Sequence, residues 1–203
     1  MFFEFLPILN DEAVIADEFF ELTGGYVRKR LCELIPEFNL IQSEDIRSRT
    51  IDVFVKALVK GGWVPDDLLT MPFTLLVDPC PANMIEHIRA VTNTSRAAAI
   101  ELNKIFGERM PFDMDILTSG AILHDVGKLV EYEKREGKVV KSRHGKMLRH
   151  PFSGVGLAYD SGLPEDVLHI IAVHAKEGDK ARMFPAAHII HHADFMTFEP
   201  FHG

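Results

Sequence analysis

The chain has 203 residues, and 47% of them are hydrophobic, which is enough to bury a sizeable core. Its net charge of -8 opposes a general role as a nucleic-acid or membrane-surface binder, because phosphate-rich partners favour positive charge. No segment approaches the roughly 18 consecutive apolar residues that a membrane span needs, and the apolar start lacks a basic leader, so we expect a soluble, cytoplasmic protein without a membrane partner.

The residue types that carry chemistry are concentrated in the second part of the chain. None of the ten histidines precedes His87, whereas the first 80 residues hold 14 acidic and 7 basic side chains. We therefore expect an N-terminal helical extension over residues 1–80 and a domain over residues 81–203 that holds the site. Cys32 and Cys80 lie far apart in the sequence and predict reduced thiols.

The predicted elements are almost all helices. In the extension, apolar residues recur at helical spacing near residues 11–22, 26–35 and 43–62. Four prolines within residues 63–82 predict a linker. Further helices are expected near residues 83–107, 113–131, 150–160, 164–176 and 184–198. The charged stretch 136–146 contains two glycines and predicts a loop or small hairpin.

This pattern predicts an all-α fold. We expect a bundle of about five core helices, an additional N-terminal helical layer and a small basic loop or hairpin. The apolar residues of the N-terminal layer would either pack on the core or form a contact between two copies of the chain, a homodimer.

The strongest local signal is the pair His124-Asp125 within Ile122–Lys128. The pair supplies an imidazole nitrogen and a carboxylate, and both are good ligands for borderline divalent metals. The preceding apolar run buries this helix, and a buried carboxylate is costly unless it is paired or bound to a metal. Lys128 lies one turn after His124, near the same face of the helix.

Four more polar residues interrupt or adjoin apolar runs in the same part of the chain. They are His87, His150, His174 and Asp194. Each one alone is an ordinary packed residue, although an unpaired polar group is expensive to bury. Together with the His-Asp pair they give four histidines and two aspartates that could converge from five helices, which is a set of ligands suited to metal ions.

In this order the residues resemble the HD superfamily of metal-dependent phosphohydrolases. The family pattern is a His on a first helix, a His-Asp pair on the next helix and a distal Asp. These positions are matched in chain order by His87, His124, Asp125 and Asp194. The resemblance covers about residues 83–198 and implies the fold of an HD-domain helical bundle.

Three further positions bear on the number of metal ions. Many members of the superfamily with two metals add two histidines between the pair and the last Asp, and His150 and His174 occupy that place. Some single-metal nucleotidases of the superfamily carry a Glu at the position of Lys128. This chain departs from them, and the resemblance therefore favours two ions.

The resemblance also implies a mechanism. Asp125 would bridge two divalent ions, with His87, His124 and Asp194 completing one site and His150 and His174 completing the other. The metal remains open among Fe, Mn, Co, Ni and Zn, because mixed His and carboxylate sites accept all of them. A metal-activated hydroxide would attack a phosphomonoester or phosphodiester. Asp125 and Lys128 would be the catalytic residues, and Lys128 would stabilise charge on the phosphoryl group or orient the attacking water.

A basic stretch, residues 134–149, lies between the His-Asp pair and His150 in the sequence. We expect it to lie near the opening of the site. It would either steer a phosphate-rich substrate or form a solvated charged hairpin. We expect a small anionic substrate, a nucleotide or a short oligonucleotide, and predict that Lys128, Arg149 and His191 contact it. His191 lies one turn before Asp194 on the same helical face.

Two other functions use the same residues. Some HD proteins are mixed-valent di-iron oxygenases that share the four histidines and two aspartates, so the ligand set cannot separate them from hydrolases. A non-catalytic module that senses a nucleotide is the other alternative, but degenerate domains of that kind have lost ligands, and none of the six is missing here.

Overall fold

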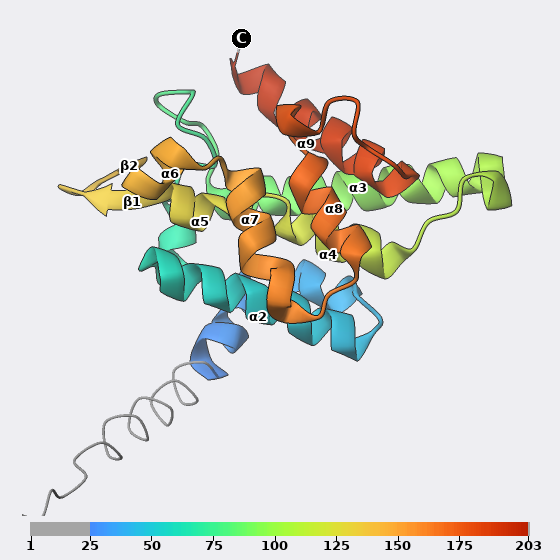
Figure 1. Ribbon diagram of the computed structural model, residues 1–203, viewed down its shortest axis with the longest axis horizontal. Helices are drawn as coiled ribbons and strands as arrows, with labels where there is room; N and C mark the ends of the chain where they lie inside the picture. Colours follow the sequence, from blue (N-terminus) through green and yellow to red (C-terminus); the bar gives the residue numbers. More distant parts are fainter. Residues whose placement is uncertain (1–24, 203) are drawn as a thin grey trace, which may run out of the picture.

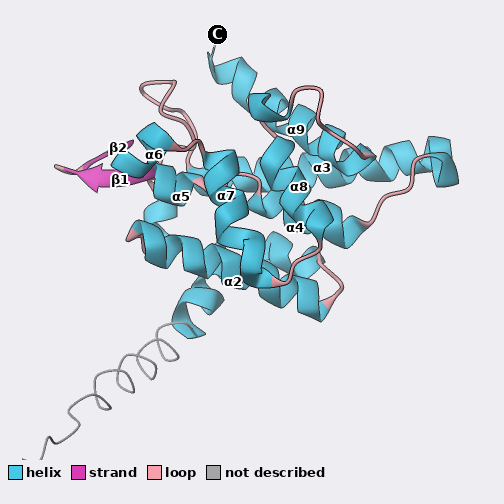
Figure 2. Ribbon diagram, in the orientation of Figure 1, coloured by secondary structure: helices cyan, strands magenta, loops and turns pink. Residues whose placement is uncertain are grey.

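The computed structural model describes residues 25–202, and most of that part of the chain is helical (Figures 1 and 2). The predicted all-α fold class is confirmed. The longer helices are α2 (Glu44–Gly61), α3 (Met84–Phe106), α4 (Met114–Leu123), α7 (His150–Ala158), α8 (Glu165–Val173) and α9 (Pro185–His202). The predicted helix near residues 11–22 lies outside the described residues, and the one expected at 26–35 spans residues 25–34.

Shorter elements connect these helices. They comprise α5 (Lys128–Glu131), α6 (Arg143–Met147) and the 3-10 turns η1 (Pro36–Leu40), η2 (Pro65–Leu69), η3 (Gly107–Arg109), η4 (Tyr159–Ser161) and η5 (Lys176–Gly178). None of the described helices is long and apolar enough to span a membrane.

Side chains that the sequence offers as caps begin and end the main helices. Ser43 accepts a hydrogen bond from the backbone of Ile46 at the start of α2, and Gly62 ends that helix in the left-handed conformation. Asn83 caps α3, while Asp113 caps α4. These caps place the starts of α2, α3 and α4 close to where the sequence predicts them.

Helix α4 lies at the centre of the bundle. It contacts α2, α3, α8 and α9, and every residue from Ile116 to Leu123 is buried. One hydrophobic cluster runs from Leu31 to Ala193, so buried residues before and after residue 80 share a core. The division of the chain at residue 80 stays a prediction.

The predicted linker over residues 63–82 packs against the bundle instead of spanning between two parts. Trp63, Met71 and Phe73 are buried in this segment. The Trp63 indole donates a hydrogen bond of 2.7 Å to the carbonyl of Leu129. The prolines of this segment correctly predict irregular backbone. Its buried apolar side chains, however, pack this backbone against the helices.

The single helix predicted over residues 113–131 is instead two helices, α4 and α5, joined by a turn at residues 124–127. In this turn the backbone bonds connect residues three apart, as from the Val126 amide to Leu123 and from the Lys128 amide to Asp125. The dihedral angles remain near helical values, which explains why the apolar periodicity continues through the break. The break places the His-Asp pair at the end of α4.

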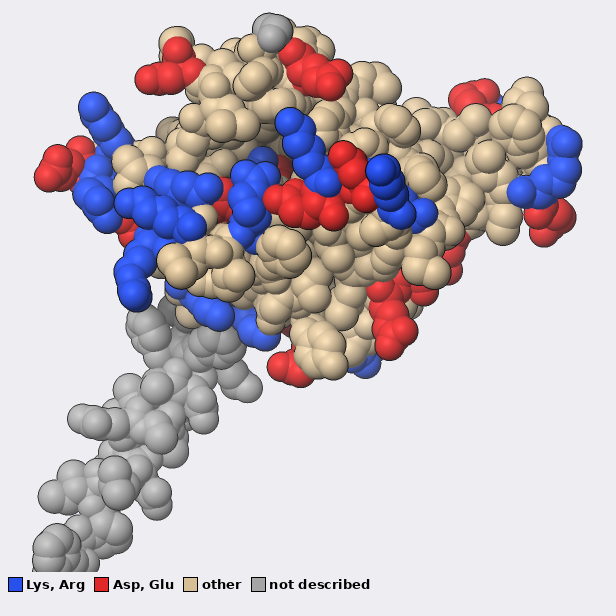
Figure 3. Space-filling model, turned by 45° about the horizontal axis from the view of Figure 1, so that its top comes forward, with Lys and Arg blue, Asp and Glu red and all other residues tan. Residues whose placement is uncertain are grey.

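A two-stranded antiparallel hairpin projects from one end of the bundle (Figure 1). It consists of β1 (Tyr132–Arg135) and β2 (Lys138–Lys141), and its turn contains Gly137 at a φ of 75°. The hairpin begins at Tyr132, four residues before the predicted stretch 136–146. The last residues of that stretch lie in α6. Figure 3 shows Lys and Arg side chains gathered at this end of the molecule.

Close packing at Gly127 supports a stability prediction. A Cβ at Gly127 would lie 2.0 Å from the carbonyl oxygen of His150 and 2.7 Å from the amide of Gly154, both backbone atoms of α7. We expect Gly127→Ala to destabilise the fold by about 1–3 kcal/mol or more, because the backbones must separate. Chemical denaturation measures this change.

The matched control is Gly156→Ala in α7, where an added Cβ meets nothing within 4 Å. This substitution should stabilise the helix by about 0.5–1 kcal/mol. Equal effects of the two substitutions would contradict the close packing of the turn on α7.

Candidate metal centre

The fold brings the six predicted ligands together at one place. His87 lies in the first turns of α3, His124 and Asp125 follow α4, His150 begins α7, His174 follows α8 and Asp194 lies in α9. Each residue comes from the end or the wall of a helix that packs its apolar face into the core. The four histidines and Asp125 are buried, and 15% of the Asp194 side chain is exposed.

The six residues form two groups that share Asp125. Ligand atoms of His87, His124, Asp125 and Asp194 lie within 4.8 Å of one another, and so do those of Asp125, His150 and His174. The two carboxylate oxygens of Asp125 face different groups. Oδ2 is 3.2 Å from His87 Nε2, whereas Oδ1 is 3.3 Å from His150 Nε2.

In each of these histidines, the hydrogen bond made by Nδ1 determines that the other ring nitrogen, Nε2, carries the lone pair. His124 Nδ1 donates to the carbonyl of Ala121 at 2.6 Å, and His174 Nδ1 donates to the carbonyl of Ile171 at 2.8 Å. His150 Nδ1 lies 3.1 Å from a carboxylate oxygen of Glu131, which can only accept. When these rings are neutral, the Nε2 atom therefore holds a lone pair that points into the centre.

His87 is oriented in the same way. The Thr197 hydroxyl donates to the carbonyl of Asp194 at 2.9 Å, so its oxygen is free to accept from His87 Nδ1, which lies 3.3 Å away. The ring of Phe73 stacks on the His87 ring with centroids 4.4 Å apart. Thus all four histidines present Nε2 to the centre.

This arrangement fits bound cations. The Nε2 atoms of His150 and His174 are 3.2 Å apart, and both carry lone pairs, which repel unless a positive charge lies between them. Oδ1 of Asp125 is buried without a hydrogen-bond partner. Inward imidazole nitrogens and carboxylate oxygens are the donors that borderline divalent metals prefer, so the residues present fit such ions.

The electrostatics of the centre keep its carboxylates ionised. Burial favours the neutral acid, but the charge of Lys128 and the neighbouring His124 outweigh it and hold the pKa of Asp125 well below its usual value. Burial also opposes ionisation of Asp194, but its hydrogen bond to His87 lowers the pKa to about 2. Burial lowers the pKa of His150 to about 4, so this ring is neutral, the form that binds metals.

Lys128 is buried beside the shared aspartate. Its Nζ donates to Asp125 Oδ2 at 2.5 Å and to the carbonyl of Phe73 at 2.8 Å. Burial alone would lower the pKa of Lys128, but the charge of Asp125 outweighs it and raises the pKa above its usual value. The lysine is therefore a fixed positive charge.

A cavity of about 640 Å³ opens onto the centre. Asp125, Lys128, His150 and Asp194 are part of its lining. Its apolar lining residues include Phe73, Leu75, Leu76, Phe195 and Phe198, and its basic residues beyond Lys128 are Lys141, Arg149 and Lys176.

Two of the three predicted substrate contacts line this cavity. Lys128 and Arg149 line it, and Arg149 pairs with Glu177 at 2.9 Å. His191 is not part of the lining, and its Nδ1 lies 2.6 Å from the carbonyl of His174. The geometry gives His191 a contact to the backbone of His174, a predicted ligand, and its predicted contact with substrate stays a prediction.

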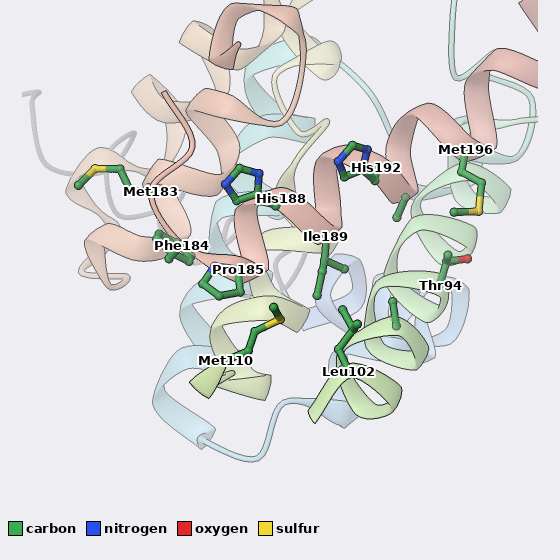
Figure 4. A pocket seen from close by; sticks show the side chains of 12 residues that line it. Thr94, Leu102, Met110, Met183, Phe184, Pro185, His188, Ile189, His192 and Met196 are labelled. Carbon is green, nitrogen blue, oxygen red and sulfur yellow. The ribbon is translucent and has the colours of Figure 1, made fainter. Parts of the chain in front are cut away.

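A second cavity, of about 560 Å³, lies between α3 and α9 (Figure 4). Its lining includes Met110, Ile189 and Met196 and none of the six predicted ligands. His188 and His192 line this cavity.

Three residues at the centre are not predicted by the sequence pattern: Phe73, Glu131 and Thr197. Phe73 lies in the predicted linker, and Thr197 is one turn after Asp194. Glu131 carries the clearest signal, because a buried Glu at the end of an apolar run needs a partner. Burial opposes its ionisation, but hydrogen bonds with His150 lower the pKa of Glu131 to about 2.

Comparison with known proteins identifies the class. The family model for the HD domain matches residues 84–197, more than half of the chain. The chain therefore belongs to the HD domain family, and the resemblance predicted from its motifs is confirmed.

One curated relative is similar over part of its length. The chain is 30% identical over 114 residues to a dihydroneopterin 2',3'-cyclic phosphate phosphodiesterase of Methanocaldococcus jannaschii. The aligned part covers 55% of this chain and 44% of the relative, less than half of the relative's length. No solved structure gives a significant match.

Metal uptake is expected to weaken as the pH falls. Burial alone would lower the pKa of His87, but its hydrogen bonds to Asp125 and Asp194 outweigh burial and raise the pKa above 6.5. A metal ion must displace that proton, so affinity should fall as the pH drops through the pKa of His87. Calorimetric titration with Mn²⁺ in two buffers of different ionisation enthalpy counts the released protons. Identical heats in both buffers would contradict this expectation.

Proposed function

We propose that this chain is a phosphodiesterase that uses two divalent metal ions to hydrolyse a small cyclic or linear phosphodiester. The observation that carries the proposal is the position of Asp125. Its two oxygens face two separate groups of ligands at the floor of one cavity, and Lys128 lies beside it.

The chain's own residues would hold the ions in two subsites. The first subsite comprises His87, His124, Asp194 and Oδ2 of Asp125, and the second comprises His150, His174 and Oδ1 of Asp125. When bound, divalent ions supply Lewis-acid stabilisation of phosphoryl oxygens and lower the pKa of water. In hydrolysis the oxygen of water bonds to phosphorus, one ester P–O bond breaks, and the leaving oxygen takes up a proton.

Lys128 contributes a positive charge that cannot move away. Its ammonium group is held by Asp125 and the carbonyl of Phe73, and it also lines the cavity. A preorganised charge of this kind stabilises the negative charge that develops on the phosphoryl group, because it needs no reorganisation during the reaction.

The lining of the cavity supports a substrate with a flat ring next to its phosphate. Its apolar lining residues include Leu75, Leu76 and Phe198, and its charged lining residues include Lys141 and Arg149. The relative's name describes a cyclic phosphate that carries a pterin, which has this character. We therefore place nucleoside and pterin cyclic phosphates first among candidate substrates, followed by linear dinucleotides.

The test is a substrate screen with protein loaded separately with Mn²⁺, Fe²⁺, Co²⁺, Ni²⁺ or Zn²⁺. We expect hydrolysis of 2',3'-cyclic nucleotides and of an aryl phosphodiester, with slower release of phosphate from monoesters. Oxygen uptake is recorded in the same reactions, because a di-iron oxygenase would consume oxygen. Binding of metal without hydrolysis of any phosphoester would overturn the proposal.

A further inference from the structure

Glu131 is a buried carboxylate that accepts hydrogen bonds from His150 and from none of the other five predicted metal ligands. Only 3% of the residue is exposed. Its Oε2 accepts hydrogen bonds from the backbone amide of His150 at 2.5 Å and from His150 Nδ1 at 3.1 Å. The carboxylate therefore holds both the backbone and the ring of this histidine.

This contact distinguishes His150 from the other three histidines. The Nδ1 atoms of His124 and His174 face carbonyl oxygens of their own helices, and that of His87 faces the hydroxyl of Thr197. His150 is the first residue of α7, so no preceding helical turn supplies such a carbonyl. Glu131, from another element, takes that role.

The two subsites also differ in the number of ligands. The first has four protein ligands, whereas the second has three, one of which is His150. Loss of the orientation of a single ring therefore costs the second subsite a larger share of its ligands. A carboxylate that accepts from Nδ1 also makes the opposite ring nitrogen a better donor to a metal.

The surrounding backbone is shaped to hold Glu131 in place. The Ser142 amide donates to its carbonyl at 2.8 Å, and Lys141 Nζ lies 3.3 Å from its Oε1. A Cβ at Gly145 would lie 2.3 Å from the carbonyl oxygen of Glu131 and 2.7 Å from its Cγ. The hairpin and the start of α6 thus wrap around this side chain.

We propose that Glu131 is the positioning residue of the second metal subsite: it holds His150 with Nε2 directed at Asp125 and thereby sets the affinity of that subsite alone. This inference rests on the proposed two-metal function and goes beyond it. It predicts that the two ions respond differently to one substitution that touches no metal.

The experiment compares Glu131→Ala with Glu131→Gln. The amide oxygen of Gln can accept both hydrogen bonds that Oε2 accepts, so the orientation of His150 is retained, whereas Ala leaves both donors without a partner. Mn²⁺ binding is measured by calorimetry and by metal content after dialysis. We expect the second ion to bind about 10–100-fold more weakly to Glu131→Ala, with the first ion unaffected, and both ions to bind Glu131→Gln within a few fold of wild type.

A second readout does not depend on activity. Long-range proton–nitrogen NMR of the Zn²⁺-loaded protein reports which nitrogen of each histidine carries the proton. We expect the Nδ1 proton of His150 in the wild type and in Glu131→Gln, and a lost or exchanging signal in Glu131→Ala. The matched control is Glu133→Ala, two residues along, where the carboxylate pairs with Arg135 on the hairpin; metal binding should not change.

Failure of the inference about Glu131 can be distinguished from failure of the proposed function. Unchanged affinity for both ions in Glu131→Ala would overturn the inference, as would an equal loss in the Ala and Gln variants. A loss of the first ion together with the second would also overturn it. Wild-type protein that takes up no divalent metal would overturn the proposed function as well, and that result would be visible before any variant is compared.

Discussion

Asp125→Asn is expected to abolish phosphodiester hydrolysis and to weaken the uptake of both metal ions. Oδ2 of this residue faces the first subsite and Oδ1 faces the second, so one substitution alters both. An amide offers one oxygen, carries no charge and cannot bridge two cations. The loss in kcat/KM should exceed the about 10²–10³-fold cost of removing a single charge-stabilising group.

The measurements are metal content, calorimetric titration and turnover of a cyclic phosphodiester. Asp160→Asn provides a matched control, because Asp160 is exposed in η4. Its metal uptake and turnover should equal those of the wild type. If Asp125→Asn still binds two ions with unchanged affinity, the bridging role of this residue is wrong.

Lys128→Met should slow turnover while leaving two bound ions. The lysine holds its ammonium group between Asp125 and the carbonyl of Phe73, on the lining of the cavity. Methionine fills similar space without a charge. We expect kcat to fall about 10²–10³-fold, the cost of one preorganised group that stabilises developing charge. Metal affinity should rise or stay constant, because a positive charge beside the ligands is removed.

A loss of turnover without a loss of bound metal would distinguish Lys128 from the proposed metal ligands. Lys60→Met, at the exposed end of α2, is the control for loss of a lysine. It should leave kcat unchanged. Full turnover by Lys128→Met would contradict the role of this charge, and loss of both ions would show that the lysine acts through the metal ligands.

The sequence predicts which polar residues cluster at the centre because these candidate ligands interrupt apolar patterns. A helix that buries its apolar face must bury any polar residue in that face, as at His124 and His174. The helices predicted to begin near residues 43 and 113 do begin there, at the caps Ser43 and Asp113. The six residues meet because α3, α8 and α9 pack on α4 and α7 packs on α8, and the pattern of each helix predicts its buried face.

The turn that separates α4 from α5 could not be predicted in this way. Apolar residues continue at helical spacing across it, and Gly127, its one unusual residue, is tolerated in helices. The reason for the turn is long-range: Gly127 lies against the backbone of His150, twenty-three positions along the chain. Local periodicity contains no information about that contact.

The residues that orient the ligands were missed for a related reason. Glu131 follows an apolar run and precedes a charged hairpin, so its local pattern resembles an ordinary helix end. Its function depends on the start of α7, where His150 has no helical carbonyl to face. Phe73 reaches His87 through irregular backbone, for which periodicity makes no prediction.

Anomalous X-ray diffraction from crystals grown with Mn²⁺ tests the central claim most directly. We expect two anomalous peaks, about 3.5–4 Å apart, that share Asp125. One peak should be bound by His87, His124 and Asp194, and the other by His150 and His174. A single peak, or two peaks without Asp125 as a common ligand, would contradict the account.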